Sequence, residues 1–209
     1  MGKIVVTNTL GELSTNCYTV YDTDTREAFM IDPCANAPFL IDMVNNQRFK
    51  LKAMLLTHGH WDHIGAVPAL REAFPEAKLY AAEAEKNVLS DIGKNLSAMF
   101  GSPLTLEADE WLREGEHLDL AGLDIECLAV PGHTEGGMCY YIKSENWIFS
   151  GDTLFAGSIG RSDFPTGDGE LLISKISEKI LSLPDETVVY SGHGPRTKVG
   201  IEKTENMFF

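Results

Sequence analysis

The stretch Thr57-His58-Gly59-His60-Trp61-Asp62-His63 holds three of the six histidines of the chain. Imidazole nitrogens and carboxylate oxygens are ligands that divalent Zn, Fe and Mn accept. His58 and His60 lie two residues apart and can reach one ion together if this segment is extended. Asp62 and His63 are adjacent, so in a helical turn their side chains diverge by about 100° and would serve a second ion. Three histidines with an aspartate favour metal binding over a surface or helix-capping role.

The residues around this stretch place it between a strand and a helix. Residues 51–56 are mostly apolar and strand-like, whereas residues 64–74 carry apolar side chains at helical spacing. The histidines are therefore expected at the carboxyl end of a strand, where folds built of sheets and helices place their chemistry. Further expected strands, at residues 123–130, 147–150 and 188–190, run into a glycine followed by His133, Asp152 and His193. A glycine there lets the backbone turn sharply and direct the next side chain.

The remaining periodicity predicts a mixed α and β domain. Residues 3–9, 17–22 and 27–32 read as an antiparallel meander. Helices are expected around residues 39–44, 82–91 and 172–183, and further strands at 78–81, 116–120 and 136–142. Residues 92–110 look irregular and suit a lid or pocket wall, with Met99 and Phe100 as candidate apolar contacts. His117 has no second ligand beside it and is interpreted as structural.

Length and charge limit the possible classes of protein. At 209 residues the chain suits one domain spanning residues 1–209, or two tightly fused halves, and can bury a proper core. Its 17 basic and 31 acidic side chains give a net charge of −14, and no segment is conspicuously basic. Nucleic acid is therefore not an expected partner, because phosphate contacts dominate such binding. A hydrophobic content of 44% with 23% charged residues is ordinary for a soluble globular enzyme, and it does not indicate the oligomeric state.

The absence of recognisable targeting signals and the pattern of cysteines favour a cytoplasmic location. No apolar run approaches the roughly 20 residues of a membrane helix, so no membrane association is expected. The N-terminus reads as a strand and not as a signal peptide. Cys17, Cys34, Cys127 and Cys139 form no C-x-x-C pair and are interpreted as buried free thiols in a reducing compartment.

The motif His58-x-His60-x-Asp62-His63 resembles the signature of the metallo-β-lactamase superfamily. Later segments resemble its remaining ligand motifs in order and at family-like separations, namely Pro131-Gly132-His133-Thr134, Phe149-Ser150-Gly151-Asp152-Thr153-Leu154-Phe155 and Ser191-Gly192-His193-Gly194-Pro195. The resemblance covers nearly the whole chain. It implies an α+β fold, the four-layer αββα sandwich, with the site at one edge between the halves. It also implies that Asn16 lies near the site, although the residues alone equally allow a turn role there.

Residue by residue, the resemblance implies two divalent metal ions. One would be held by His58, His60 and His133, and the other by Asp62, His63 and His193. Asp152 would bridge them, since a carboxylate has two oxygens and paired metals sit about 3.5–4 Å apart. Zn is the expected metal, with Fe or Mn as alternatives, because histidine and carboxylate ligands accept all three.

Such a site would make the chain a metal-dependent hydrolase. Adjacent cations lower the pKa of a bound water, to about 7 even for one zinc, so that a metal-bound hydroxide is available at neutral pH. They also polarise the substrate carbonyl and stabilise the oxyanion. No serine or cysteine nucleophile is then required, and the sequence has no G-x-S-x-G elbow. Asp62 is the expected catalytic residue, orienting the hydroxide or passing a proton to the leaving group.

The segment from Gly151 to Phe164 is similar to the glyoxalase II group, the hydroxyacylglutathione hydrolases, and particularly to its short bacterial relatives. This similarity implies hydrolysis of glutathione thioesters such as S-lactoylglutathione, hence an anionic thioester as substrate. Arg161 and Asp163 either form a supporting ion pair under the site or touch the substrate, and the supporting pair is the expectation. Full-length members continue into a helical domain that supplies glutathione-binding basic residues, whereas this chain stops at Phe209. The metal chemistry therefore transfers more directly than the substrate, and no residue is assigned to substrate binding.

Other functions compete with this one. An iron-dependent persulfide dioxygenase of the same superfamily would bind one iron through His58, His133 and Asp152, and a hydrolase of other thioesters or esters is also compatible. A non-enzymatic metal-binding module is disfavoured because a structural site is closed and needs no second ion. The acidity disfavours a nuclease, and the missing secretion signal disfavours an antibiotic lactamase.

Overall fold

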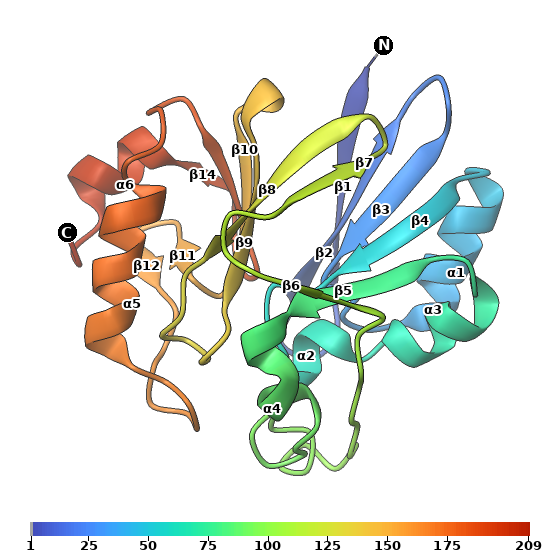
Figure 1. Cartoon of the computed structure of the whole chain (residues 1–209), viewed down its shortest axis with the longest axis horizontal. Coiled ribbons are helices and arrows are strands. Elements are labelled where there is room, and N and C mark those ends of the chain that lie inside the picture. The colour runs from blue at the N-terminus through green and yellow to red at the C-terminus, as the bar shows by residue number, and fades with distance from the viewer. Residues whose placement is uncertain (1) are drawn as a thin grey trace.

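In the computed structural model, which describes residues 2–209, two six-stranded sheets lie face to face with helices on both outer sides (Figure 1). Helices α1 (Ala37–Asn46) and α3 (Val67–Ala73) lie outside the first sheet. Helices α5 (Gly169–Lys175) and α6 (Val199–Glu205) lie outside the second. This confirms the predicted α+β fold of the four-layer αββα kind.

The first sheet combines a meander with parallel strands. Its order is β1 (Lys3–Leu10), β2 (Thr15–Asp22), β3 (Glu27–Ile31), β4 (Lys50–Leu55), β5 (Lys78–Ala82) and β6 (Glu110–Leu112). The pairs β1/β2 and β2/β3 are antiparallel, which confirms the predicted meander. The pairs from β3 to β6 are parallel, so these strands end at the same edge of the sheet.

The second sheet has the order β14-β13-β10-β9-β8-β7. Its strands are β7 (His117–Leu120), β8 (Leu123–Ala129), β9 (Met138–Ile142), β10 (Trp147–Gly151), β13 (Val188–Ser191) and β14 (Thr197–Lys198). Strands β10 and β13 are parallel and the other pairs are antiparallel. A short hairpin, β11 (Leu154–Phe155) with β12 (Ser158–Ile159), follows β10.

Several helices are shorter or more divided than the periodicity predicted. The helix expected at 64–74 is two helices, because α2 (Trp61–Ile64) ends at Gly65 before α3 begins. A side chain at Gly65 would come within 2.5 Å of the Cys34 carbonyl, so this turn packs backbone against backbone. The helix expected at 82–91 is η1 (Glu83–Glu85) plus α4 (Lys86–Leu89). The helix expected at 172–183 begins at Gly169 and continues as the π-helical turn η3 (Ile176–Ile180), and η2 (Lys143–Glu145) joins β9 to β10.

Three apolar layers separate the four structural layers. Met54 packs with α1 and α3 outside the first sheet, whereas its neighbour Leu55 points between the sheets. Tyr140 likewise lies between the sheets, and Tyr141 packs against α5 and η3. This alternation is the two-residue period of a strand. Because each fully buried large apolar side chain contributes about 1.5–3 kcal/mol, the layers hold both sheets in a fixed relation.

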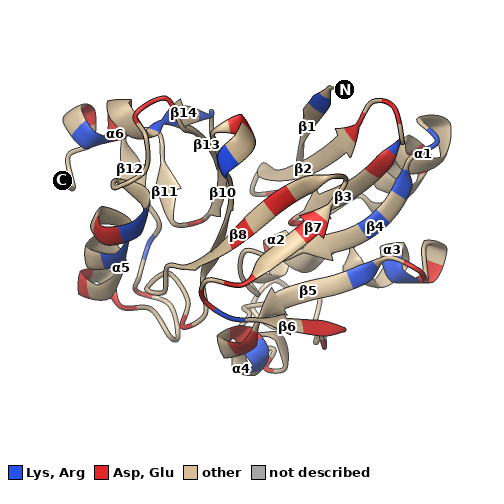
Figure 2. Cartoon of the chain, turned by 45° about the horizontal axis from the view of Figure 1, so that its top comes forward, with Lys and Arg blue, Asp and Glu red and all other residues tan. Residues whose placement is uncertain are grey.

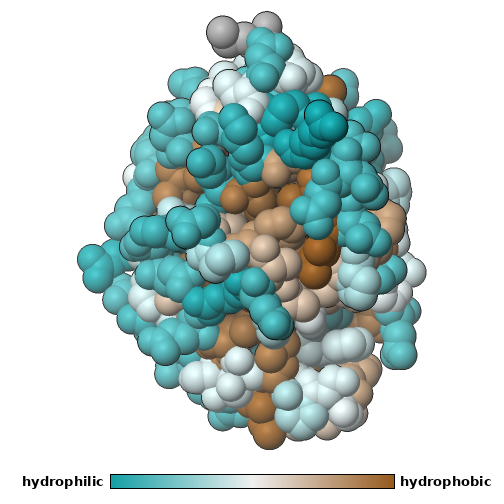
Figure 3. Space-filling model, turned by 90° about the vertical axis from the view of Figure 1, so that its right-hand side faces the viewer, coloured by the Kyte–Doolittle hydropathy of each residue, from teal (hydrophilic) through white to brown (hydrophobic). Residues whose placement is uncertain are grey.

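The outer surface is polar and mixed in charge. Figure 2 shows Lys and Arg scattered among Asp and Glu on the helices and strands. On the face of the molecule that forms the right-hand side of Figure 1, polar side chains border a narrower apolar strip (Figure 3). None of the helices within residues 2–209 has the length and apolar character required to cross a membrane.

Candidate metal centre

The side chains predicted as ligands lie at one end of the two sheets, each just after a strand. The His58-to-His63 stretch follows β4, and the other ligand loops follow β8, β10 and β13. Potential ligand atoms lie within 4.8 Å of one another in three groups, which are His58/His60/His133, His58/His63/Asp152 and Asp62/His63/His193. All seven predicted residues are therefore brought together. The first triad, His58/His60/His133, and the second triad, Asp62/His63/His193, are linked by the remaining group, which shares His58 with one and His63 with the other and adds Asp152.

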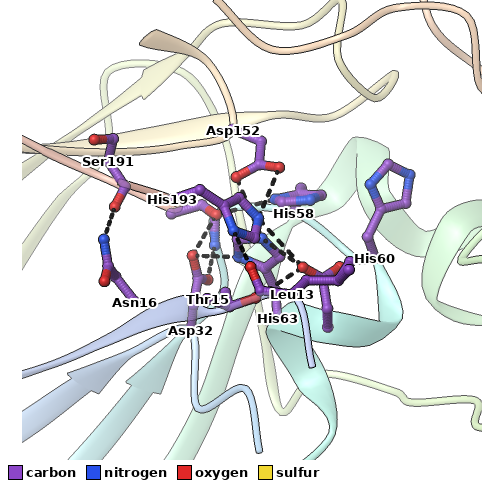
Figure 4. Close-up of polar contacts among 12 residues, drawn as sticks. Leu13, Thr15, Asn16, Asp32, His58, His60, His63, Asp152, Ser191 and His193 are labelled. Atoms are coloured by element: carbon purple, nitrogen blue, oxygen red, sulfur yellow. Dashed lines mark hydrogen bonds and ion pairs between the residues drawn. The ribbon is translucent and has the colours of Figure 1, made fainter. Parts of the chain in front are cut away.

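Asp152 faces both triads with its two carboxylate oxygens (Figure 4). Its Oδ1 lies 3.3 Å from His63 Nε2. Its Oδ2 lies 3.4 Å from His193 Nε2 and 3.7 Å from His133 Nε2. This position between His133 on one side and His63 and His193 on the other fits a carboxylate shared by two cations.

Two glycines make this close assembly possible. Gly151 has φ +51°, and a Cβ there would lie 2.2 Å from Thr57 Oγ1. A Cβ on Gly192 would lie 2.2 Å from Asp152 Oδ1 and 2.7 Å from His63 Cε1. In the pattern of strand, glycine and ligand, Gly151 is therefore needed for its positive φ, and Gly192 is needed because the Asp152 and His63 side chains lie so close to it.

Burial leaves several ligand atoms without a hydrogen-bond partner. Such unpartnered, fully buried side-chain atoms in residues 2–209 include His58 Nε2, His60 Nε2, His63 Nε2 and Asp152 Oδ1. Buried polar atoms without partners are costly unless something else satisfies them. Because imidazole nitrogens and a carboxylate oxygen are all metal ligands, the cluster fits a dinuclear metal site.

The electrostatics of the first triad keep its imidazoles neutral. Burial, followed by repulsion from neighbouring imidazoles, lowers the pKa of His58 and brings that of His60 to about 3. Burial also lowers the pKa of His133. Neutral imidazole is the form that binds a metal ion, so these three need not lose a proton.

The second triad is governed by its carboxylates. Burial alone would lower the pKa of His63, but the charges of Asp62, Asp152 and Asp32 raise it. Burial also opposes the rise at His193, whose hydrogen bonds to Asp152 and Asp62 bring its pKa to about 9. For Asp62, the charge of His63 and the bond to His193 overcome burial and lower the pKa to about 2. Asp62 is therefore ionised at neutral pH.

Asp32 supports the second triad and was not predicted from the sequence. Its Oδ2 lies 2.9 Å from His63 Nδ1 and accepts a hydrogen bond from the Thr57 hydroxyl at 2.6 Å. Its Oδ1 accepts a hydrogen bond from the Thr57 backbone nitrogen at 2.8 Å. Such partners orient a ligating imidazole and leave Nε2 facing the metal. Its position directly after β3, at the same edge as the histidine stretch, was the available signal.

The first residues of β2 support the opposite side of the cluster. Asn16 Nδ2 donates to the carbonyls of Ser191 at 3.0 Å and Gly194 at 2.9 Å, on both sides of His193. The hydroxyl of Thr15 donates to Asp62 Oδ2 at 2.9 Å. Asn16 therefore lies next to the site, as the resemblance implied, and it fixes the loop that carries His193.

Glu85 is a second residue that sequence analysis missed, because it was interpreted as part of a helix. Its side chain is fully buried. It accepts hydrogen bonds from Gly59 N at 2.8 Å, Gly136 N at 2.9 Å and the Thr134 hydroxyl. Burial raises its pKa to about 7, and the three hydrogen bonds oppose that rise. Glu85 thus joins the loop of His58 and His60 to the loop of His133.

A cavity of about 580 Å³ opens in front of the cluster. Apolar side chains form much of its lining, including Leu13, Trp61, Leu96, Phe100, Phe155 and Phe164. Arg161 also lines it and forms the predicted ion pair with Asp163, at 2.7 and 2.6 Å. The pair is exposed at the cavity rim and not beneath the site, while the Arg161 carbonyl lies 2.7 Å from His133 Nδ1.

Other sequence interpretations concern residues outside the cluster. His117 is exposed on β7 and pairs with Asp124 at 2.8 Å, in agreement with a structural role. Cys17, Cys34, Cys127 and Cys139 are free and buried, as predicted.

Comparison with known proteins adds relatives of similar length. The family model described as the metallo-beta-lactamase superfamily matches residues 10–193. The hydroxyacylglutathione hydrolase GloC of Haemophilus influenzae is 39% identical over 197 residues, which cover 92% of this chain and 92% of that protein. The probable metallo-hydrolase YqgX of Bacillus subtilis is 37% identical over 201 residues, which cover 95% of this chain and 94% of that protein.

Solved structures with the same fold cover nearly the whole chain. BLEG-1 B3 metallo-beta-lactamase matches with a TM-score of 0.93 and 39% identity, over 98% of this chain and 99% of that chain. TTHA1623 in a di-iron-bound form matches with a TM-score of 0.87 and 34% identity, over 98% of this chain and 100% of that chain. ETHE1 from Myxococcus xanthus matches with a TM-score of 0.80 and 29% identity, over 98% of this chain and 83% of that chain.

Proposed function

Because the chain belongs to the metallo-β-lactamase superfamily, we propose that this metallo-hydrolase cleaves glutathione thioesters such as S-lactoylglutathione. The similarity to a hydroxyacylglutathione hydrolase over most of both chains supports this substrate class. The cavity in front of the cluster supports a small-molecule substrate. In this proposal residues 1–209 form one hydrolase domain.

The position of Asp152 between the two triads carries the proposal. His58, His60 and His133 would hold one divalent ion, and Asp62, His63 and His193 the other, with Asp152 bridging them. Zn is the proposed metal because it accepts this histidine and carboxylate set without redox chemistry. A related structure contains two irons, which supports a dinuclear site and keeps iron as the alternative metal.

When bound, the two ions would supply a hydroxide nucleophile at neutral pH and polarise the thioester carbonyl. The side chains of this chain would do the remaining work. Asp62 is held by the Thr15 hydroxyl at 2.9 Å, and its Oδ2 lies 3.3 Å from His193 Nε2 at the cavity. In this place an ionised Asp62 would orient the nucleophile or carry a proton toward the leaving thiol.

A persulfide dioxygenase is the second candidate function. It would need only His58, His133 and Asp152 around a single iron, and Asp152 Oδ2 lies 3.7 Å from His133 Nε2. Hydrolysis of thioesters or esters with another leaving group is a further possibility within the same metal chemistry.

The test is hydrolysis of S-lactoylglutathione by purified protein whose metal content has been quantified, with His58→Ala as control. We expect turnover that requires about two metal equivalents and is lost in the variant. Negligible turnover by metal-loaded protein would contradict the substrate class. One iron per chain together with oxygen uptake on glutathione persulfide would instead establish the second candidate.

A further inference from the structure

The cavity beside the metal-binding cluster has an apolar wall made by Trp61, Leu96 and Phe100. We infer that this acyl wall, defined by those three residues, binds an uncharged apolar acyl group of the substrate. The inference rests on the proposed function, because the acyl group would belong to the thioester that is cleaved at the cluster. It adds a preference for apolar over charged acyl groups.

The wall has a fixed position relative to the cluster. Trp61 stands between His60 and Asp62 in the chain, so its ring is attached to the segment that supplies both triads. The rings of Trp61 and Phe100 stack with centroids 4.4 Å apart and an interplanar angle of 24°. Phe100 remains 41% exposed. An apolar ligand group could therefore cover the free part of this aromatic surface while its carbonyl lies at the cluster.

Hydrogen bonds hold the loop behind the wall in one conformation. Trp61 N donates to the Asn95 carbonyl at 2.9 Å. Asn95 Nδ2 donates to the Leu104 carbonyl at 2.7 Å, and Ser97 Oγ accepts from Leu104 N at 3.0 Å. Leu96 is buried with φ +67°, a conformation that a leucine adopts only where its surroundings enforce it. The wall is thus built before any ligand binds.

The charges around the cavity favour an uncharged group at this wall. Among the described residues that line the cavity, Arg161 is the one Lys or Arg. Its guanidinium is bound by both carboxylate oxygens of Asp163 and lies 3.9 Å from the centroid of the Phe164 ring. A carboxylate on the acyl group would therefore find no unpaired Lys or Arg among those lining residues. A hydrocarbon group gains from leaving water without needing a counter-charge.

The first test measures binding and needs no hydrolysis. Acetate, butyrate and hexanoate share one head group, so their affinities for zinc-loaded protein can be compared by calorimetry. We expect affinity to rise roughly tenfold for each two added methylenes, since burying one CH₂ contributes about 0.8 kcal/mol. Phe100→Ala should flatten this gradient. Equal affinity for the three acids, or an unchanged gradient in Phe100→Ala, would overturn the inference.

Met99→Ala provides the matched control. Met99 adjoins Phe100 in the same loop and is 70% exposed, but it is not among the described residues that line the cavity. The gradient should survive in this variant, with metal content and melting temperature confirming that both variants are folded. A gradient lost equally in both variants would indicate a general loop effect and overturn the role of Phe100.

The second test compares S-acetylglutathione with S-hexanoylglutathione, so that the thiol stays constant. The wild type should favour the hexanoyl substrate in kcat/KM, and Phe100→Ala should lose more on that substrate than on the acetyl one. If no glutathione thioester is cleaved but the carboxylate gradient is present, the proposed function fails and the acyl wall stands. If thioesters are cleaved without any preference or gradient, the acyl wall fails and the hydrolase proposal stands.

Discussion

Asp32 Oδ2 lies 2.9 Å from His63 Nδ1, and both side chains are buried (Figure 4). Thr57 donates to the same carboxylate from its backbone nitrogen and its hydroxyl, and these two hydrogen bonds fix the orientation of Asp32. The Asp32 carboxylate already accepts hydrogen bonds from Thr57 at both of its oxygens, so it acts as an acceptor at this position. His63 must therefore place its Nδ1 hydrogen toward Asp32, which leaves Nε2 free for an ion.

Asp32→Asn should weaken metal binding by about 10- to 100-fold, since the amide can present a hydrogen to Nδ1 and disturb the tautomer of His63. Loss of the ion bound through His63 should precede loss of the other. Titration with a chelating dye, with the two binding steps resolved, measures this.

Asp124→Asn is the matched control for Asp32→Asn. Asp124 forms a similar pair with His117 at 2.8 Å, but both side chains are exposed and distant from the cluster in the fold. This variant should bind metal like the wild type. If both metal-binding steps of Asp32→Asn have the same affinities as in the wild type, the role given to Asp32 is contradicted.

Glu85 should make the metal-free protein less stable as pH rises from about 4.5 to about 7. Burial raises the folded-state pKa of Glu85 to about 7, from a usual value of 4.5. The folded state then holds a proton that the unfolded state has released, and stability falls by ~3 kcal/mol across this interval. Glu85→Gln lacks the titration, so the stability advantage of the wild type over this variant should shrink between pH 5 and pH 8. Urea unfolding at both pH values checks the sign.

The control for Glu85 is Glu83→Gln. Glu83 belongs to the same short helix, but it is exposed and a hydrogen bond from Arg113 lowers its pKa. A lowered pKa produces no loss of stability between pH 5 and pH 8, so this variant should follow the wild type. A constant difference between wild type and Glu85→Gln would argue against the raised pKa.

Local signals in the sequence predicted a mixed α and β domain and a metal-binding stretch, whereas the four-layer fold and the assignment of seven ligands came from the resemblance. Four ligands stand within the run from His58 to His63, and His133, Asp152 and His193 each follow a strand and a glycine. Asp32 and Glu85 carry no such signal, because their partners are remote. Asp32 is 31 residues from His63, and Glu85 is 51 residues from Gly136. For Asp32 the one signal was its place directly after β3, at the sheet edge that also carries the histidine stretch, whereas Glu85 meets Gly136 only when the two sheets are assembled.

The helix lengths predicted from the sequence were wrong for a related reason. Apolar spacing predicted one helix over residues 64–74, yet Gly65 lies against the Cys34 carbonyl and the chain divides there into α2 and α3. Periodicity reports which face of a segment is apolar, whereas a close backbone contact with another segment decides where the helix breaks. The same limit hid the Trp61 and Phe100 stack, which joins a helix start to an irregular loop.

Gly192→Ala should disrupt the cluster although it changes no ligand. Its methyl group would meet Asp152 Oδ1 at 2.2 Å and His63 Cε1 at 2.7 Å, so one of the two must move. Purified Gly192→Ala should contain fewer metal equivalents than the wild type. Gly157→Ala is the control, since a methyl group there meets no described atom within 4 Å and strains only the backbone at φ +70°. It should cost about 1 kcal/mol of stability and keep its metals. Full metal content in Gly192→Ala would show that the cluster can relax.

Asp62→Asn separates a ligand role of Asp62 from a catalytic one. Asparagine keeps the shape and one oxygen but removes the charge that lies 3.3 Å from His193 Nε2, so metal affinity should fall modestly and can be restored with excess Zn. Under that saturation, turnover of S-lactoylglutathione should still be about 10²- to 10⁴-fold lower, because a positioned group that transfers a proton is missing. Thr15→Val removes only the hydroxyl that holds Asp62 Oδ2, so it should cost far less activity. If Asp62→Asn reaches wild-type turnover once its metal sites are saturated with added Zn, Asp62 acts only as a metal ligand.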